Sequence, residues 1–238
     1  MGDVRLAIDT ATTRLSVALD LPGHDPVRYR VDGHRQHAAA LLPLIEKGLV
    51  ELGAVLADVG TVALADGPGS FTGLRVGAAV GKALGRAGGA RLVVAPSLLV
   101  RAAGLAGQRT EAVLAVSDAL RGEVYAGVWQ FHAGSIVELL APGTLDVEAL
   151  HLLPVVDRAV GEAPANVLTA LAARGLELIS PCLPSATVLL GLIDREGGCR
   201  EIEDLESWEP VYGRPAEAQA KWERSHGRTL PDSPGRLG

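Results

Sequence analysis

Residues 4–20 read VRLAIDTATTRLSVALD. Aliphatic and β-branched runs on both sides of a polar turn are typical of a β-hairpin, and Asp9 stands at the first corner of this one. The same layout returns at residues 111–131, EAVLAVSDALRGEVYAGVWQF, where Asp118 takes the corresponding corner. Each hairpin is followed by alternating helix and strand patterns. The sequence therefore predicts a duplicated, mixed α/β fold.

The length of the chain, 238 residues, is sufficient for two lobes that each bury a core. We expect these lobes to cover residues 1–106 and 107–222. Residues 223–238 are short of apolar side chains and rich in turn formers, so they are expected to form a disordered tail. Hydrophobic residues make up 48% of the chain but aromatic ones only 3%, which predicts an aliphatic core.

The formal net charge is −6, which gives the chain no overall attraction for a polyanion and argues against a lone nucleic-acid binder. Cys182 and Cys199 have no CxxC spacing, so neither a disulfide nor a zinc site is expected. No signal-peptide pattern follows Met1, and no run of about 18 apolar residues occurs. A soluble, cytoplasmic protein without a membrane span is predicted.

Residues 67–77, GPGSFTGLRVG, raise the question of a phosphate-binding loop. Their glycines do not fit the Rossmann spacing, and Leu74 and Arg75 stand where a P-loop carries Lys and then Ser or Thr. A Gly-rich loop before a helix can still hold an anion on free backbone N–H groups, with Ser70, Thr72 and Arg75 nearby. The alternative, which we favour, is a tight turn that caps the helix.

The helix predicted after this loop carries glycines at every fourth position, Gly73, Gly77, Gly81 and Gly85. On a helix they form one smooth strip. Because each interior glycine costs about 1 kcal/mol relative to alanine, the strip is expected to pack closely against another helix, in this chain or in a second subunit. The proposed neighbour is the earlier helix that has apolar residues at helical spacing, namely Leu41, Leu42, Ile45 and Leu49.

Asp9 and Asp118 occupy the corners where two acidic residues flank a nucleotide and its metal in actin-like kinases and ATPases. Those proteins have a glycine two residues after each Asp, which lets the backbone approach a phosphate. Here the two positions are Ala11 and Leu120. The added Cβ atoms weaken the case for a working ATP site between the halves.

Other catalytic and metal-binding patterns are also missing. His34 and His37 are spaced to share one helical turn, but no third ligand is placed to complete a metal site. No HExxH motif occurs, and GPGSFTG lacks the spacing of a nucleophile elbow. Neither a catalytic residue nor a metal ligand is predicted.

Several segments resemble those of the TsaB (YeaZ) family, in the same order along nearly the whole chain apart from the tail. They are LAIDTATTRLSVAL, QHAAALLPLI, GPGSFTGLRVG, APSLLVRAA, DALRGEVYAGVW and EPVYGRP. Two positions depart from the family pattern. Leu120 stands where the family often has Arg, and Ala38 stands where Ser commonly follows the His.

The resemblance implies an actin-like fold of two related lobes, with mixed sheets flanked by helices. It also implies a role in making N6-threonylcarbamoyladenosine at position 37 of tRNAs that read codons starting with A. In that system TsaB is a non-catalytic relative of the transferase TsaD, forms a dimer with it through helices of the N-terminal lobe, and helps to recruit the ATPase TsaE. Contact with tRNA is then expected through the complex, and the isolated chain could form a homodimer.

The resemblance assigns the strip and its neighbouring helix to the partner interface. The interface residues so predicted are His37, Leu41, Leu42, Ile45, Leu49, Gly73, Leu74, Gly77, Ala78, Gly81 and Gly85. A bulky residue at Gly77 or Gly81 is then expected to abolish the heterodimer and leave the fold intact.

No tightly bound cofactor is expected, although a weak or composite ATP or ADP site shared with partners could involve Asp9, Ser70, Thr72 and Arg75. An active small-molecule kinase or ATPase of the actin-like superfamily is the alternative, and ATP turnover by the isolated chain would favour it. An endopeptidase, suggested by older naming of related proteins, has no supporting residues. Tail arginines that could touch RNA are Arg224, Arg228 and Arg236.

Overall fold

The computed structural model describes residues 3–33, 36–107, 109–119, 122–180 and 185–213. Some residues that entered the sequence predictions lie outside these ranges. They are His34, Leu120, Cys182 and the predicted tail at 223–238 with its three arginines. Predictions that concern them stay predictions.

The first lobe is built on a six-stranded mixed sheet with the order β11-β5-β4-β1-β2-β3. Its central strand β1 pairs antiparallel with β2 and parallel with β4, and β4 pairs parallel with β5. The strands are β1 (Val4–Asp9), β2 (Arg14–Asp20), β3 (Val27–Asp32), β4 (Val59–Ala65), β5 (Arg91–Ala95) and β11 (Arg200–Glu201).

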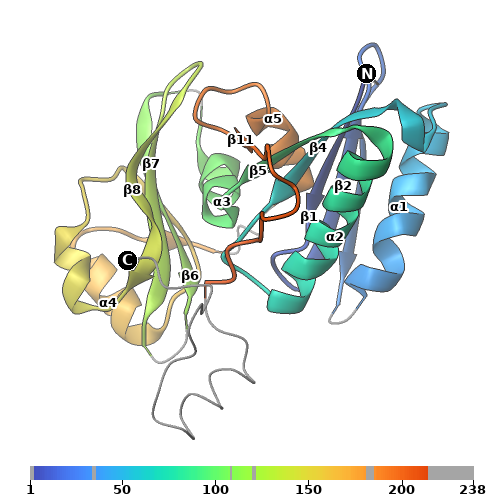
Figure 1. Cartoon of the computed structure of the whole chain (residues 1–238). Coiled ribbons are helices and arrows are strands. Elements are labelled where there is room, and N and C mark those ends of the chain that lie inside the picture. The colour runs from blue at the N-terminus through green and yellow to red at the C-terminus, as the bar shows by residue number, and fades with distance from the viewer. Residues whose placement is uncertain (1–2, 34–35, 108, 120–121, 181–184, 214–238) are drawn as a thin grey trace, which may run out of the picture.

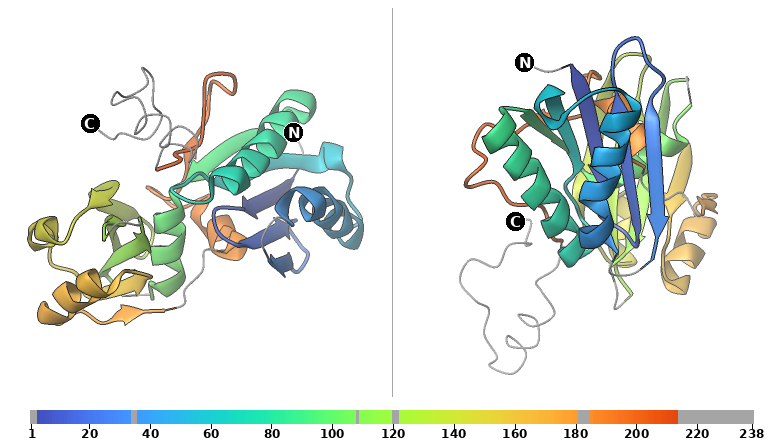
Figure 2. Two further views of the ribbon diagram at one scale, coloured as in Figure 1. Left: turned by 90° about the horizontal axis from the view of Figure 1, so that it is seen from below. Right: turned by 90° about the vertical axis from the view of Figure 1, so that its right-hand side faces the viewer.

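Two long helices cover one face of this sheet, α1 (His37–Glu51) over β2 and β3 and α2 (Phe71–Gly88) over β4 and β5. The short 3-10 helix η1 (Leu56–Asp58) precedes β4. Helix α5 (Ala186–Leu192) packs on β1, β2 and β4, and α3 (Ser97–Leu105) lies between the lobes, against α5, β6 and β7 (Figures 1 and 2).

The second lobe contains a five-stranded sheet with the order β10-β9-β6-β7-β8. The short 3-10 helix η2 (Glu148–Leu152) and α4 (Ala165–Ala173) belong to this lobe. Its strands are β6 (Glu111–Asp118), β7 (Val124–Phe131), β8 (Ile136–Leu145), β9 (Arg158–Gly161) and β10 (Leu178–Ile179).

The two sheets repeat one arrangement. In the first lobe β1 pairs antiparallel with β2 and parallel with β4, and in the second β6 pairs antiparallel with β7 and parallel with β9. Asp9 and Asp118 are the last residues of β1 and β6. The prediction of a duplicated α/β fold with two related lobes is thereby confirmed.

The predicted division at residues 106 and 107 separates α3 from the first strand of the second lobe, but the C-terminal extent of the second lobe differs from the prediction. The second lobe ends near β10, and the chain then returns to the first lobe, where α5 packs on the first sheet and β11 pairs with β5. This return buries Ile202 and Trp208 in the core of the first lobe. The predicted range 107–222 therefore included a segment, residues 186–213, that completes the first lobe.

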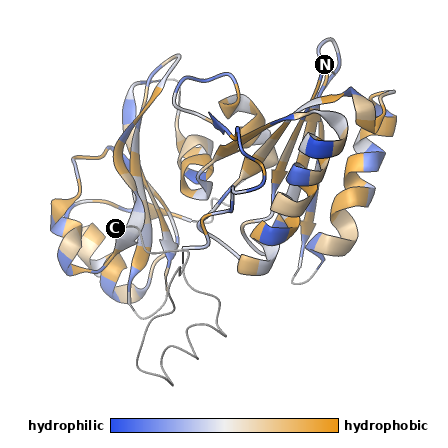
Figure 3. Ribbon diagram, in the orientation of Figure 1, coloured by the Kyte–Doolittle hydropathy of each residue, from blue (hydrophilic) through white to orange (hydrophobic). Residues whose placement is uncertain are grey.

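The hydrophobic core is divided by the first sheet, because successive side chains of a strand point to opposite faces. Leu6 and Ile8 of β1 pack in the cluster that includes α1 and α2, whereas Ala7 packs in the cluster that includes α3 and α5. The outward sides of α1 and α2 carry a mixture of polar and apolar residues (Figure 3).

Within the described part of the chain, no helix combines the length and the apolar character that crossing a membrane requires.

Candidate functional site

The loop between β4 and α2 holds the C-terminal segment of the described chain. Gly67 has a φ of 113°, and a Cβ at this position would clash with the carbonyl oxygen of Val211. The Val211 N–H donates to the Asp66 carbonyl at 2.7 Å, and the Gly67 N–H donates to Ser97 Oγ at 3.0 Å. These contacts join the start of the GPGSFTGLR loop to the described part of the EPVYGRP segment.

The remaining glycines of this loop lie against the turn of the first hairpin. A Cβ at Gly69 would clash with the carbonyl oxygen of Ala11, and one at Gly73 with that of Thr10. The Ser70 N–H donates to the Ala11 carbonyl at 2.7 Å, and Ser70 Oγ accepts from the Gly73 N–H at 3.2 Å. The loop is therefore a tight turn and N-cap, the alternative favoured from the sequence.

Arg75 is held at the surface by two aromatic rings. Its guanidinium carbon lies 4.2 Å from the ring centroid of Phe71 and 5.7 Å from that of Tyr212. The two ring centroids are 4.7 Å apart. Arg75 thus makes cation–π contacts that join α2 to the C-terminal segment, while Ser70 and Thr72 are exposed beside it. A composite nucleotide site at these residues stays a prediction.

The corner of the first hairpin is closed to solvent. Asp9 is 1% exposed, its Oδ1 accepts from the Ala11 N–H at 3.0 Å, and its Oδ2 has no hydrogen-bond partner among the described residues. Burial raises the pKa of the Asp9 carboxyl to about 6, and the Ala11 hydrogen bond and the nearby Arg101 charge only partly oppose this rise.

Arg101 fills the space between the two lobes at this corner. It projects from α3, is buried, and donates from Nη1 to the carbonyl of Val116 on β6 at 3.1 Å. Gly161, at the end of β9, has a φ of 130°, and a Cβ there would lie 2.9 Å from Arg101 Nη1. The buried Arg101 guanidinium therefore joins α3 to β6, and its charge acts on Asp9 at the end of β1.

The sequence patterns identified neither Arg101 nor a second buried carboxylate, Asp66. Asp66 follows β4, and burial raises its pKa to about 6 against the opposing charge of Arg200, whose Nη2 lies 3.0 Å from Asp66 Oδ2. The only signal for Arg101 was a single charge inside the apolar helix SLLVRAAGL. Asp66 stood at the end of an apolar strand, as Asp9 does.

The second corner differs from the first. Asp118 is exposed, whereas the following Ala119 is buried and its N–H donates to the Glu123 carbonyl at 3.0 Å. The two acidic corners were predicted as corresponding positions, and the sheet topology agrees. Their environments are nevertheless unequal, because the Asp9 side chain is buried whereas Asp118 is exposed.

The glycine strip of α2 faces the sheet of its own lobe, which corrects the predicted contact with another helix. A Cβ at Gly77 would lie 2.7 Å from Thr10 Oγ1, and one at Gly81 would lie 2.8 Å from Leu64 Cδ1. Gly85 likewise faces Leu205 of the C-terminal segment. A bulky residue at Gly77 or Gly81 therefore disturbs the fold itself, contrary to the expectation that it would affect only a heterodimer.

Most of the other predicted interface residues are also part of the core. On α1 and α2 the buried ones are His37, Leu41, Ile45, Leu49, Leu74 and Ala78. Helical spacing identified one side of each helix correctly but could not say what covers it. Leu42 is the exception, because its side chain is 57% exposed.

The outer face of α1 and α2 is the side turned away from the sheet. On α1 it includes Ala39, Leu42 and Val50, and Val50 is 72% exposed. On α2 it includes Ala79 and Ala83. The half-buried Val76, Val80 and Leu44 extend this apolar surface toward the core. Exposed apolar surface on two adjacent helices is typical of a protein–protein contact.

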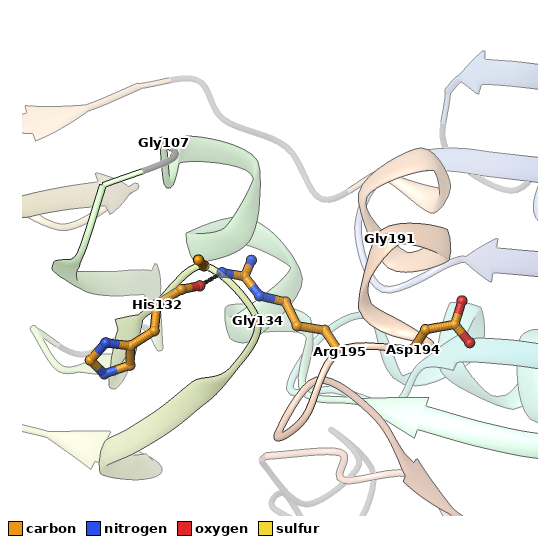
Figure 4. A pocket seen from close by; sticks show the side chains of 7 residues that line it. Gly107, His132, Gly134, Gly191, Asp194 and Arg195 are labelled. Carbon is orange, nitrogen blue, oxygen red and sulfur yellow. Dashed lines mark hydrogen bonds between the residues drawn. The ribbon is translucent and has the colours of Figure 1, made fainter.

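Among the described residues, no group of three or more His, Cys, Asp or Glu side chains is placed to hold a metal ion. A cavity of about 610 Å³ lies where the β7–β8 turn approaches the end of α5 (Figure 4). There the Arg195 guanidinium donates to the carbonyl of His132, and the same guanidinium lies 5.4 Å from the Phe131 ring centroid. Arg195 thus ties the end of α5 to the second lobe.

Comparison with known proteins identifies relatives over most of the chain. The model of the family described as TsaD, tRNA N6-adenosine threonylcarbamoyltransferase, matches residues 32–175. The chain is 41% identical over 128 residues to the tRNA threonylcarbamoyladenosine biosynthesis protein TsaB of Escherichia coli (strain K12). That match covers 52% of this chain and only 54% of the E. coli protein.

Two further relatives match over nearly their full length. The TsaB protein of Bacillus subtilis (strain 168) is 28% identical over 230 residues, which covers 91% of this chain and 96% of that protein. A solved structure of YeaZ from Pseudomonas aeruginosa is 28% identical and superposes with a TM-score of 0.69 over 89% of this chain and 100% of that chain. The TsaD family model matches more than half of the residues, so the chain belongs to that family. Together with its TsaB and YeaZ relatives, this match identifies the chain as a member of the TsaB (YeaZ) family, as its sequence segments predicted.

Proposed function

We propose that this protein is a non-catalytic subunit of the machinery that makes N6-threonylcarbamoyladenosine at position 37 of tRNA. In this role it forms a heterodimer with a TsaD-type transferase and helps to recruit a TsaE-type ATPase, and tRNA is contacted through the assembled complex in the cytoplasm. The observation that carries the proposal is the match to the TsaB protein of B. subtilis over 91% of this chain.

The closed Asp9 corner supports a non-catalytic role. A nucleotide between the lobes of an actin-like fold needs room for phosphates and a metal near this carboxylate. Here the Arg101 guanidinium and the Ala11 methyl group occupy the corner, and Asp9 is almost fully buried.

The outer face of α1 and α2 supports a partner surface on the first lobe. Leu42 and Val50 expose apolar side chains at the surface of α1, where contact with water is unfavourable and burial against another protein stabilises a complex. This exposed surface is the proposed partner interface, in place of the inward-facing residues that were predicted from the sequence. In the isolated chain the same surface is available for a homodimer.

No tightly bound cofactor is part of this proposal. A weak ATP or ADP site shared with partners would use Ser70, Thr72 and Arg75, which are exposed at the start of α2. Asp9 would contribute only through its charge, since its carboxylate has no access to solvent.

The test is size-exclusion chromatography with light scattering on this protein, alone and mixed with the cognate TsaD-type subunit. A threonylcarbamoylation assay with and without the protein follows, together with a measurement of ATP turnover by the protein alone. A heterodimer that stimulates modification, with no turnover by the isolated chain, is expected. Failure to bind the cognate subunit, combined with intrinsic ATP hydrolysis, would replace the proposal with a kinase-like function.

A further inference from the structure

The cavity of about 610 Å³ beside Arg195 lies between the two lobes (Figure 4). It is bordered by the β7–β8 turn of the second lobe and by the end of α5, which packs on the first sheet. Gly134 and Gly191 keep the space open, since a Cβ at either position would meet no atom within 4 Å. A cavity of this volume is large enough for a small organic molecule.

The Arg195 guanidinium lines this cavity and is only partly satisfied by the protein. Its Nη2 donates to the His132 carbonyl, whereas its Nη1 makes no hydrogen bond or ion pair with any residue that the structure describes. Nε is fully buried, but Nη1 is not, so Nη1 is open to solvent. Because a half-buried charge without a counter-ion is unfavourable, a bound anion would stabilise this arrangement.

The carboxylates nearest to this cavity are engaged by other cations. Asp194 lines the cavity but forms an ion pair with Arg5, and Figure 4 shows its carboxylate pointing away from the Arg195 guanidinium. Glu111, at the start of β6, pairs with Arg158 at 3.7 Å. The positive charge of Arg195 is therefore available to an anion from outside the chain.

The β7–β8 turn adds backbone donors beside the guanidinium. The His132 N–H is used by the Ser135 carbonyl at 2.9 Å, whereas the N–H groups of Ala133 and Gly134 donate to no residue in the described part of the chain. Both of these residues line the cavity and are exposed. A guanidinium together with free backbone N–H groups is a donor set that suits phosphate and carboxylate oxygens.

We propose that this cavity binds a small molecule through one oxyanionic group, a phosphate or a carboxylate, held by Arg195. The ligand contacts the β7–β8 turn of the second lobe and the end of α5 on the first lobe, so its binding favours one arrangement of the two lobes. The site is separate from the outer face of α1 and α2, and its occupancy requires no partner protein.

The experiment uses the full chain alone and titrates it with inorganic phosphate and, separately, with acetate at constant ionic strength. The readouts are the heat of binding and the midpoint of thermal unfolding, which a ligand of the folded state raises. Saturable binding of at least one of the two anions is expected. Binding of phosphate alone identifies a phosphate site, and binding of acetate alone identifies a carboxylate site.

Two variants place the binding in this cavity. Arg195→Gln removes the charge and should weaken anion binding at least tenfold. Because Arg195 also holds the His132 carbonyl, Gly191→Met is the second variant. It fills the open space at the end of α5 without a clash and should weaken binding by a similar factor while the chain stays folded. Gly88→Met, at the end of α2 and equally free of neighbours, is the matched control and should bind like the wild type.

The proposal is overturned if neither phosphate nor acetate gives saturable binding, or if Gly191→Met and Gly88→Met bind the anion equally well. The titrations use the isolated chain, so they decide whether the site exists even if the protein does not associate with a TsaD-type subunit.

Discussion

The inner and outer faces of α1 and α2 have opposite properties although both are rich in small and aliphatic residues. Inside, Gly77 and Gly81 bring the backbone of α2 so close to the first hairpin and the sheet that a Cβ does not fit. Outside, Leu42 and Val50 point into solvent. The comparison teaches that regular glycine spacing marks close approach within the chain, whereas the proposed partner surface lies on the opposite side of the two helices.

The largest expected effect comes from filling the inner face. Gly73→Val places a branched side chain against the backbone of Thr10 and should lower the free energy of unfolding by more than about 3 kcal/mol. Ala79→Val, on the outer face of the same helix, should change it by less than about 0.5 kcal/mol. Urea unfolding of both variants measures the difference, and similar losses would mean that the two faces are not distinct.

The buried carboxyl group of Asp9 gives the next largest effect, and it depends on pH. Its pKa is raised from 3.8 to about 6, so folding favours the protonated form. The stability that Asp9 contributes is therefore fully present below pH 3.8 and is lost as the pH rises through about 6. The full span corresponds to at most about 3 kcal/mol.

Asp9→Asn removes this titration and should lack the gain in stability that the wild type shows on acidification from about pH 6 to pH 4. Asp32, whose pKa is lowered chiefly by its hydrogen bond with Arg14, is the control with the opposite sign. Its stabilising contribution is lost only as the pH falls through and below 3.8, so Asp32→Asn should keep the wild-type gain between about pH 6 and pH 4. Chemical unfolding across this pH range checks both, and identical pH profiles for Asp9→Asn and wild type would contradict the burial argument.

A smaller effect is expected at the starts of the two helices. Ser70 caps α2 by accepting from the Gly73 N–H, whereas the Gln36 side chain makes no such bond at the start of α1. Ser70→Ala should lower the free energy of unfolding by about 1 kcal/mol. Gln36→Ala should leave this free energy unchanged. Thermal unfolding measures both variants, and an equal loss of stability in the two would mean that the cap of α2 contributes nothing.

Much of the architecture could be predicted because it depends on local patterns. The strands around Asp9 and Asp118 alternate between apolar runs and polar turns, and this repeated layout predicted the duplication. The loop before α2 was correctly interpreted as a turn and cap because its glycine spacing fits neither named phosphate motif.

The parts that could not be predicted depend on contacts between distant segments. Nothing local to residues 186–213 indicates that they return to the first lobe, since β11 has only two residues and its partner β5 lies about a hundred positions earlier in the chain. Helical periodicity located the glycine strip but not the sheet that covers it. Arg101 was missed because its role depends on Asp9 and Val116, which are contributed by separate lobes.

The central claim is that the outer face of α1 binds the transferase partner. The most direct test measures the affinity of the cognate TsaD-type subunit for Leu42→Asp and for Val155→Asp, a charge placed at a 90% exposed valine of the second lobe. Leu42→Asp should fold normally and weaken binding by at least about thirtyfold, corresponding to about 2 kcal/mol, while Val155→Asp binds like the wild type. Equal affinity of Leu42→Asp and wild type would contradict the claim.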